Sequence, residues 1–109
     1  MTVIAVVTTV ASRADARRLA EALVRRGLAA CAQIAAIESV YRWQGEVQAE
    51  DEWRVVFKTV AGRYEDVERA LLELHPDELP EIHAVALDPV HAPYAGWVRE
   101  HSAGDPQAT

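Results

Sequence analysis

Two long strand-like segments meet at one tight turn near the middle of the chain, and this hairpin restricts the fold more than any other feature. The segment Cys31–Trp43 is followed by Gln44 and Gly45, a pair typical of a tight reversal, and then by a second strand-like segment, residues 47–60. At about 3.3 Å per residue each arm is roughly 40 Å long. A compact domain of this length is only roughly 34 Å across. The tip of the hairpin is therefore predicted to project beyond its own core.

Aromatic side chains on the projecting part predict an oligomer. Tyr41, Trp43 and Trp53 could each bury about 150–250 Å², and leaving them in water on an unpaired sheet edge invites aggregation. We therefore expect other copies of the chain to cover the hairpin in a closed homo-oligomer, with these three residues and Glu52 at the interface. The alternative is a bulge that folds the hairpin back over its own sheet.

The remaining segments complete an α+β fold. We expect, in order, a strand at residues 3–9, a helix between Ser12 and Gly27, the hairpin, a helix from Tyr64 to Leu74, a strand at residues 82–87 and a short last helix that begins near Pro93. This βαββαβ order is that of the ferredoxin-like sandwich, one antiparallel sheet with two helices on one face. Tyr94, Trp97 and Val98 are expected to anchor the last helix in the core. Residues 1–101 are predicted to form a single domain and residues 102–109 a flexible tail.

Composition excludes several classes of protein. The chain has 109 residues, a mass of 12.0 kDa and a net charge of −6, which argues against binding to nucleic acid. No uncharged run approaches the ~20 residues of a membrane-spanning helix, and no basic residue precedes Arg13 as a secretory signal would require. We therefore expect a cytoplasmic protein with no membrane partner. Its single cysteine, Cys31, cannot form an intrachain disulfide.

Four short motifs in order make the chain resemble a known family. They are Tyr41-x-Trp43-x-Gly45-x-Val47 followed by Glu52 and Lys58-Thr59, then His75-Pro76 with Pro80-Glu81, Leu28-Ala29-Ala30-Cys31 after the first helix, and Tyr94-x-x-Trp97. With these motifs the chain resembles the CutA-type divalent-cation tolerance proteins over residues 3–98.

The resemblance implies a ferredoxin-like protomer in a tight homotrimer whose long hairpins reach across to neighbours, much as in PII-type signal proteins. It also implies an association with copper and other divalent ions. Family members linked to copper can carry a cysteine near the end of the first strand, where this chain has Thr8, and some have an aromatic residue where it has Asp77. A hydroxyl is a poor substitute for a thiolate as a copper ligand.

Candidate ligand-binding residues follow from the same regions. His75 could bind a metal ion, with Asp77 or Glu81 supplying oxygen; alternatively it is a histidine at a helix C-terminus that bonds backbone carbonyls. Lys58, with Trp43, could meet an anionic ligand, although an ion pair would also explain the lysine.

These residues favour a binding function over catalysis. No nucleophile is paired with a base, and no two carboxylates stand in a recognisable catalytic frame. We therefore expect a non-enzymatic, homotrimeric divalent-metal response protein that binds copper or another ion weakly at subunit clefts. The alternative is a PII-like regulatory trimer that binds a metabolite, a nucleotide or a protein partner.

Overall fold

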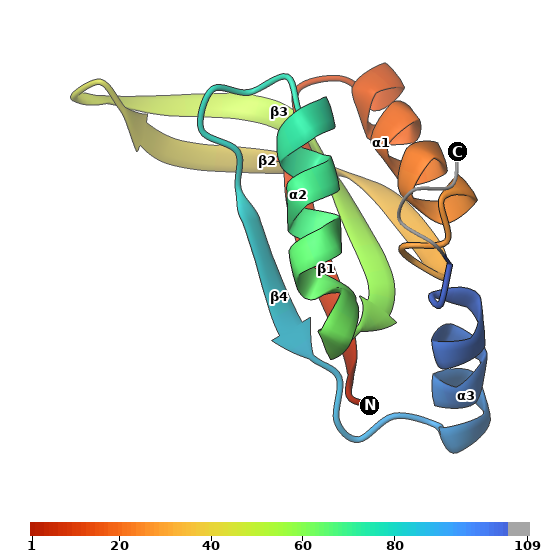
Figure 1. Cartoon of the computed structure of the whole chain (residues 1–109). Coiled ribbons are helices and arrows are strands. Elements are labelled where there is room, and N and C mark those ends of the chain that lie inside the picture. Colours follow the sequence, from red (N-terminus) through yellow and green to blue (C-terminus); the bar gives the residue numbers. More distant parts are fainter. Residues whose placement is uncertain (105–109) are drawn as a thin grey trace.

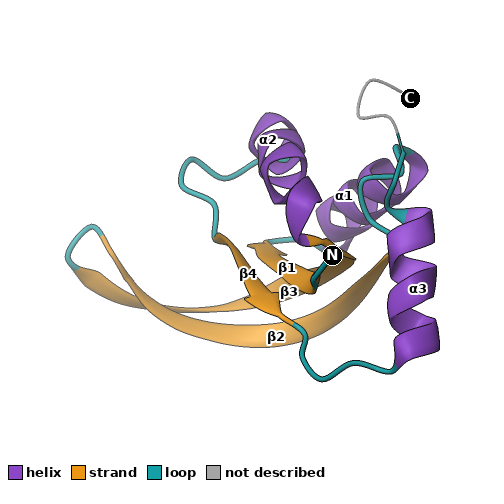
Figure 2. Cartoon of the chain, turned by 60° about the horizontal axis from the view of Figure 1, so that its bottom comes forward, coloured by secondary structure: helices purple, strands orange, loops and turns teal. Residues whose placement is uncertain are grey.

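The structure, a computed structural model, describes residues 1–104 and has the predicted ferredoxin-like α+β architecture. Its elements are β1 (Val3–Val10), α1 (Arg13–Arg25), β2 (Cys31–Trp43), β3 (Glu46–Val60), a 3-10 turn (Ala61–Arg63), α2 (Tyr64–Leu74), β4 (Ile82–Ala86) and α3 (Ala92–His101). The sheet has the strand order β2-β3-β1-β4, and all neighbouring strands are antiparallel. Helices α1 and α2 lie on one face of this sheet (Figures 1 and 2). None of the helices described is long and apolar enough to cross a membrane.

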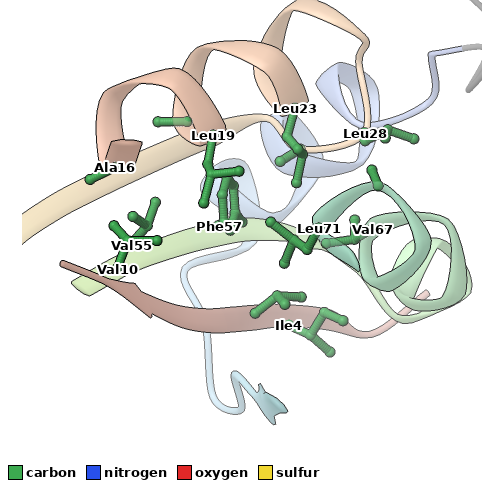
Figure 3. Close-up of a cluster of buried hydrophobic side chains, with 14 residues drawn as sticks. Ile4, Val10, Ala16, Leu19, Leu23, Leu28, Val55, Phe57, Val67 and Leu71 are labelled. Atoms are coloured by element: carbon green, nitrogen blue, oxygen red, sulfur yellow. The ribbon is translucent and has the colours of Figure 1, made fainter. Parts of the chain in front are cut away.

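The core lies between those two helices and the sheet. Apolar residues recur along α1 and α2 at helical spacing, so each helix presents one buried stripe. Figure 3 shows Leu19 and Leu23 of α1 and Leu71 of α2 meeting Phe57 of β3, and all four side chains are fully buried. Helix α3 packs separately, through Val98, against the start of β1.

Short-range interactions determine where helix α1 begins and where the hairpin turns. The Ser12 side chain caps α1 by accepting a hydrogen bond from the Asp15 backbone N–H (3.1 Å). At the hairpin tip Gln44 (φ 50°) and Gly45 (φ 80°) both adopt the left-handed conformation, as a two-residue turn that matches the strand twist requires. This turn places Trp43 opposite Glu46, and so sets the register of the whole hairpin.

The hairpin projects beyond the sheet, as predicted. Strand β3 has 15 residues, whereas its neighbour β1 has 8. Residues 53–58 of β3 pair with β1 on one side and β2 on the other, and residues 59 and 60 pair with β1. In the described chain residues 46–52 pair with β2 alone. The molecule is accordingly elongated, 44 Å in its longest dimension, with the hairpin extending to one side (Figure 1).

Two expectations about the C-terminal region were wrong in part. Val98 is buried and Tyr94 packs half-buried against the same cluster, but Trp97 is an exposed residue on α3 that stacks on Tyr94, at 5.9 Å between ring centroids. The tail expected to begin at Ser102 is packed as far as Gly104; residues 105–109 lie outside the described residues.

A backbone hydrogen bond to the residue after α1 and the side chain of Arg63 hold this packed segment in place. The backbone N–H of Gly104 donates to the carbonyl of Gly27 at 3.1 Å, and the Arg63 side chain donates to the carbonyls of Ser102 and Gly104. A Cβ built on either glycine would lie 2.7 Å from the Cα of the other. The two glycines therefore allow an approach that no larger residue permits.

Gly27→Ala should destabilise the protein more than Gly45→Ala. Both glycines have positive φ, so each substitution costs about 1 kcal/mol of backbone strain. Only the new Cβ at position 27 also meets Gly104, which adds roughly 1–2 kcal/mol of overpacking. Urea unfolding of both variants at one protein concentration measures the difference, and equal losses would contradict the described packing.

Candidate functional site

A cleft opens where β1 ends and the hairpin continues. One wall is the projecting hairpin, and the other is the connection between α2 and β4, residues 76–81, which arches beside the hairpin in Figure 2. The cleft has a volume of about 700 Å³, which is within the usual range for small-ligand sites. Its acidic residues are Glu50 and Glu52 on the hairpin and Asp77, Glu78 and Glu81 on the connection. Of the described residues that line it, none is a lysine or an arginine.

Strand alternation places the hairpin side chains together. Side chains two residues apart share a face of a strand, so Tyr41 and Trp43 lie on one face of β2, and Glu50 and Glu52 share a face of β3. The register pairs Ser39 with Glu50, so these two sets lie on the same face of the hairpin. Tyr41 and Glu50 are diagonal neighbours within reach of each other.

The carboxylates make the electrostatic potential of the cleft negative, and this potential disfavours ionisation of Tyr41. Its pKa is raised above the ordinary value by a side-chain hydrogen bond to Glu50, by partial loss of solvation, and by the negative charges of Glu50, Glu52 and Asp77. Because Asp77 belongs to the opposite wall, acids of both walls act on one phenol. The cleft therefore favours cations over anions.

Hydrogen bonds to the end of β1 hold the second wall in place. The Thr8 hydroxyl donates to the Glu81 carbonyl at 2.6 Å. His75 accepts the Asp77 backbone N–H at its Nδ1 (3.0 Å), so the proton of the neutral ring is on Nε2. That nitrogen lies 2.9 Å from the Thr9 carbonyl, to which it donates, and 3.1 Å from the Thr8 hydroxyl. His75 and Thr8 together fix the connection beside the hairpin.

Comparison with known proteins identifies the family. The CutA1 divalent ion tolerance protein family matches residues 4–101. The divalent-cation tolerance protein CutA of Thermus thermophilus is 38% identical over 98 residues, 89% of this chain and 95% of that protein. Its Thermococcus kodakarensis counterpart is 30% identical over 90% of this chain and 94% of its own length. This chain belongs to the CutA family.

Solved structures agree with this assignment. The T. thermophilus CutA1 structure superposes with a TM-score of 0.89 at 36% identity, covering 93% of this chain and 99% of that one. CutA from Synechococcus elongatus gives 0.90 at 34% identity, covering 94% and 91%. This chain thus has the CutA fold.

The structure changes the interpretation of the predicted metal ligands in this CutA chain. His75, Asp77 and Glu81 do lie near one another, but the contacts described above occupy both ring nitrogens of His75. Within residues 1–104, no three side chains of His, Cys, Asp or Glu are placed to hold a metal ion. In this arrangement His75 positions the connection, as its alternative interpretation as a histidine bonding backbone carbonyls suggested.

The other predicted residues separate into two groups. Trp43, Tyr41 and Glu52 line the cleft. Lys58 does not, because the register places it opposite Cys31 at the far end of the hairpin, where its Nζ donates to Gln33 at 3.0 Å.

Trp53 also lies outside the cleft. It packs half-buried against the core of its own chain. Its indole is thus partly covered without a neighbouring copy, unlike the aromatic rings nearer the hairpin tip.

Sequence reasoning missed several cleft residues. Glu50, Thr9 and Glu78 are not among the residues that the sequence singled out. Their meeting depends on the contact between Thr8 and Glu81, 73 positions apart in the chain. The alternation of Tyr41 with Trp43 and of Glu50 with Glu52 was the one local signal that could have placed the hairpin wall.

Thr8→Val and Thr9→Val should differ in their effect on stability. Valine at position 8 leaves the Glu81 carbonyl without its donor, which should cost about 1–3 kcal/mol of unfolding free energy. Within residues 1–104 the Thr9 hydroxyl makes no hydrogen bond, so Thr9→Val should stay within about 0.5 kcal/mol of the parent. Chemical denaturation measures both, and equal effects would mean that Thr8 does not hold the connection.

Proposed function

We propose that this chain is a non-enzymatic divalent-cation response protein that acts as a homotrimer and binds an ion weakly at clefts between its subunits. The observation that supports this best is the arrangement of carboxylates. Five of them, from two separate segments, face one cleft that has no basic residue among its described lining. A divalent cation would relieve their mutual repulsion.

The side chains favour an ion that accepts oxygen ligands. Carboxylates are the ligands of hard cations such as magnesium, calcium and manganese, whereas copper(I) prefers thiolates. The position next to His75 is Thr8, a hydroxyl, and both nitrogens of that histidine are engaged. Copper, if bound here, would have to be copper(II) held by oxygen.

Weak binding follows from the spread of these ligands. Because no three candidate side chains in the described chain converge on a point, water or a neighbouring subunit would supply the remaining ligands. A solvated divalent ion in an open site is expected to bind and leave readily, as a response protein requires.

Assembly as a trimer is supported by apolar surface on the projecting hairpin. Val40 and Val47 are 69% and 64% exposed in the single chain, and the rings of Tyr41 and Trp43 are also accessible. The free edge of β2 adds a row of unpaired backbone groups. Neighbouring copies that cover the hairpin would bury its apolar side chains and its unpaired backbone groups. They would also place their own residues beside the cleft.

Calorimetric titration with Mn²⁺ and Cu²⁺ tests the ion-binding proposal. The double variant Glu50→Gln/Asp77→Asn removes one charge from each wall, and binding should weaken by about tenfold or more because charged oxygen ligands are lost. The control variant is Glu100→Gln, because Glu100 is exposed on α3 and lies outside the cleft. It should bind the ions with the affinity of the parent. Unchanged affinity in the double variant would refute the site, and loss confined to His75→Ala would instead place the ion on the imidazole.

A further inference from the structure

Helix α3, at one edge of the domain in Figure 1, is attached separately from the rest of the fold. Its buried residues, Ala95 and Val98, pack with Val3 in a small apolar cluster that is distinct from the core beneath α1 and α2. We propose that α3 and the residues after it form a unit that opens independently of the domain, and that the Arg63 side chain keeps this unit closed. The described lining of the cleft includes no residue of this unit, so the inference goes beyond ion binding.

A helix as short as α3 depends on the domain for its stability. It has 10 residues, whereas isolated helices shorter than about 12–15 residues are marginal in water. In the described chain its N-cap residue, His91, makes no side-chain hydrogen bond to the first turn, so the usual contribution of a cap is missing. Helix α3 is therefore expected to unfold locally whenever its contacts with the domain are lost.

Residues 102–104, which we call the C-terminal latch, join α3 to the turn that precedes α2. The Ser102 hydroxyl donates to the Val98 carbonyl at 2.5 Å and so satisfies a carbonyl in the last turn of α3. Arg63 donates through Nε to the Ser102 carbonyl at 2.9 Å, and through Nη2 to the Gly104 carbonyl. One side chain from outside the unit thus holds two backbone carbonyls of the C-terminal latch.

The surroundings of Arg63 fix its side chain where it can hold the C-terminal latch. The side chain is only 17% exposed, and its Nη1 forms an ion pair with Asp66, in the first turn of α2, at 3.1 Å. A guanidinium has five N–H groups in a rigid fork, so one arginine can donate to three separate oxygens. Hydrogen bonds from a charged donor are stronger than those between neutral groups. Loss of this side chain therefore weakens the attachment of α3 more than loss of an ordinary surface contact would.

Opening of the unit would change the surroundings of Cys31, the single cysteine of the chain. The Tyr94 hydroxyl of α3 lies 3.7 Å from the Cys31 Sγ, and the thiol is half-buried. The pKa of Tyr94 is raised above its ordinary value by partial burial and by its contact with Cys31, as expected for a phenol packed against the thiol. When α3 leaves the domain, Tyr94 leaves with it, so the C-terminal latch controls how accessible this thiol is.

Native-state hydrogen exchange of the full-length chain, followed by mass spectrometry, tests the proposal. Arg63→Met should speed exchange of the α3 amides by about tenfold or more, because two charged hydrogen bonds are lost. Exchange of the β1 amides, which lie in the core, should change by less than about twofold. Arg69→Met is the matched control and should leave α3 unchanged: Arg69 also pairs with Asp66 at 3.1 Å but, within residues 1–104, does not bond to the C-terminal latch.

Alkylation of Cys31 by N-ethylmaleimide measures the same opening independently. Its rate should rise about threefold or more in Arg63→Met, since the open population rises with the exchange rate. Ser102→Ala removes the donor to Val98 without altering Arg63, and it should speed exchange and alkylation even if Arg63→Met does not fold.

Three results would overturn the proposal. The first is that α3 and β1 amides of the parent exchange at one common rate, which would mean that α3 opens only with the whole domain. The second is that Arg63→Met and Arg69→Met affect α3 equally. The third is that Cys31 is alkylated at the parent rate in a variant whose α3 amides exchange faster.

Discussion

The mismatch in length between β1 and the hairpin is the constraint on which the rest of the structure depends. After Val10 the chain leaves the sheet to begin α1, whose cap is Ser12, while β2 and β3 continue side by side. From that point β3 has a strand on one side only in the described chain. Its other side becomes the wall of a cleft, and its apolar residues lose the cover that the core gives to Val55 and Phe57.

The second wall depends on a few hydrogen bonds of modest individual strength. A typical intramolecular hydrogen bond contributes about 0.5–1.5 kcal/mol net, and those of Thr8 and His75 hold one short connection to the end of β1. They keep Asp77 and Glu81 near the acids of the hairpin in spite of like-charge repulsion. Under the proposed function, a bound cation would relieve this repulsion, which the contacts of Thr8 and His75 hold in place.

Much of the fold could be predicted because its signals are local. The helical stripes of α1 and α2, the Ser12 cap and the turn at Gln44 and Gly45 are short-range features, and the structure has all of them. The two-residue turn even fixes the register, so Lys58 could have been placed opposite Cys31 and away from the tip by counting.

The cleft was predicted only in part because contacts distant in sequence create it. Hairpin residues such as Trp43 could be singled out by type, but nothing local shows that residues 76–81 approach them. The residue type of His75 permitted two roles, a metal ligand or a histidine at a helix end that bonds backbone carbonyls. Its actual role follows from the backbone groups of Thr9 and Asp77, which surround the ring only after folding. The packing of Gly104 on Gly27 has the same origin.

In the proposed trimer, neighbouring copies would cover the exposed apolar hairpin and complete the cleft at its base. Sedimentation equilibrium at micromolar concentration tests this most directly, since it reports mass without reference to shape. We expect a single species of three times the chain mass of 12.0 kDa. A folded particle of 12.0 kDa would contradict it, because the hairpin would then be stable in water without a partner.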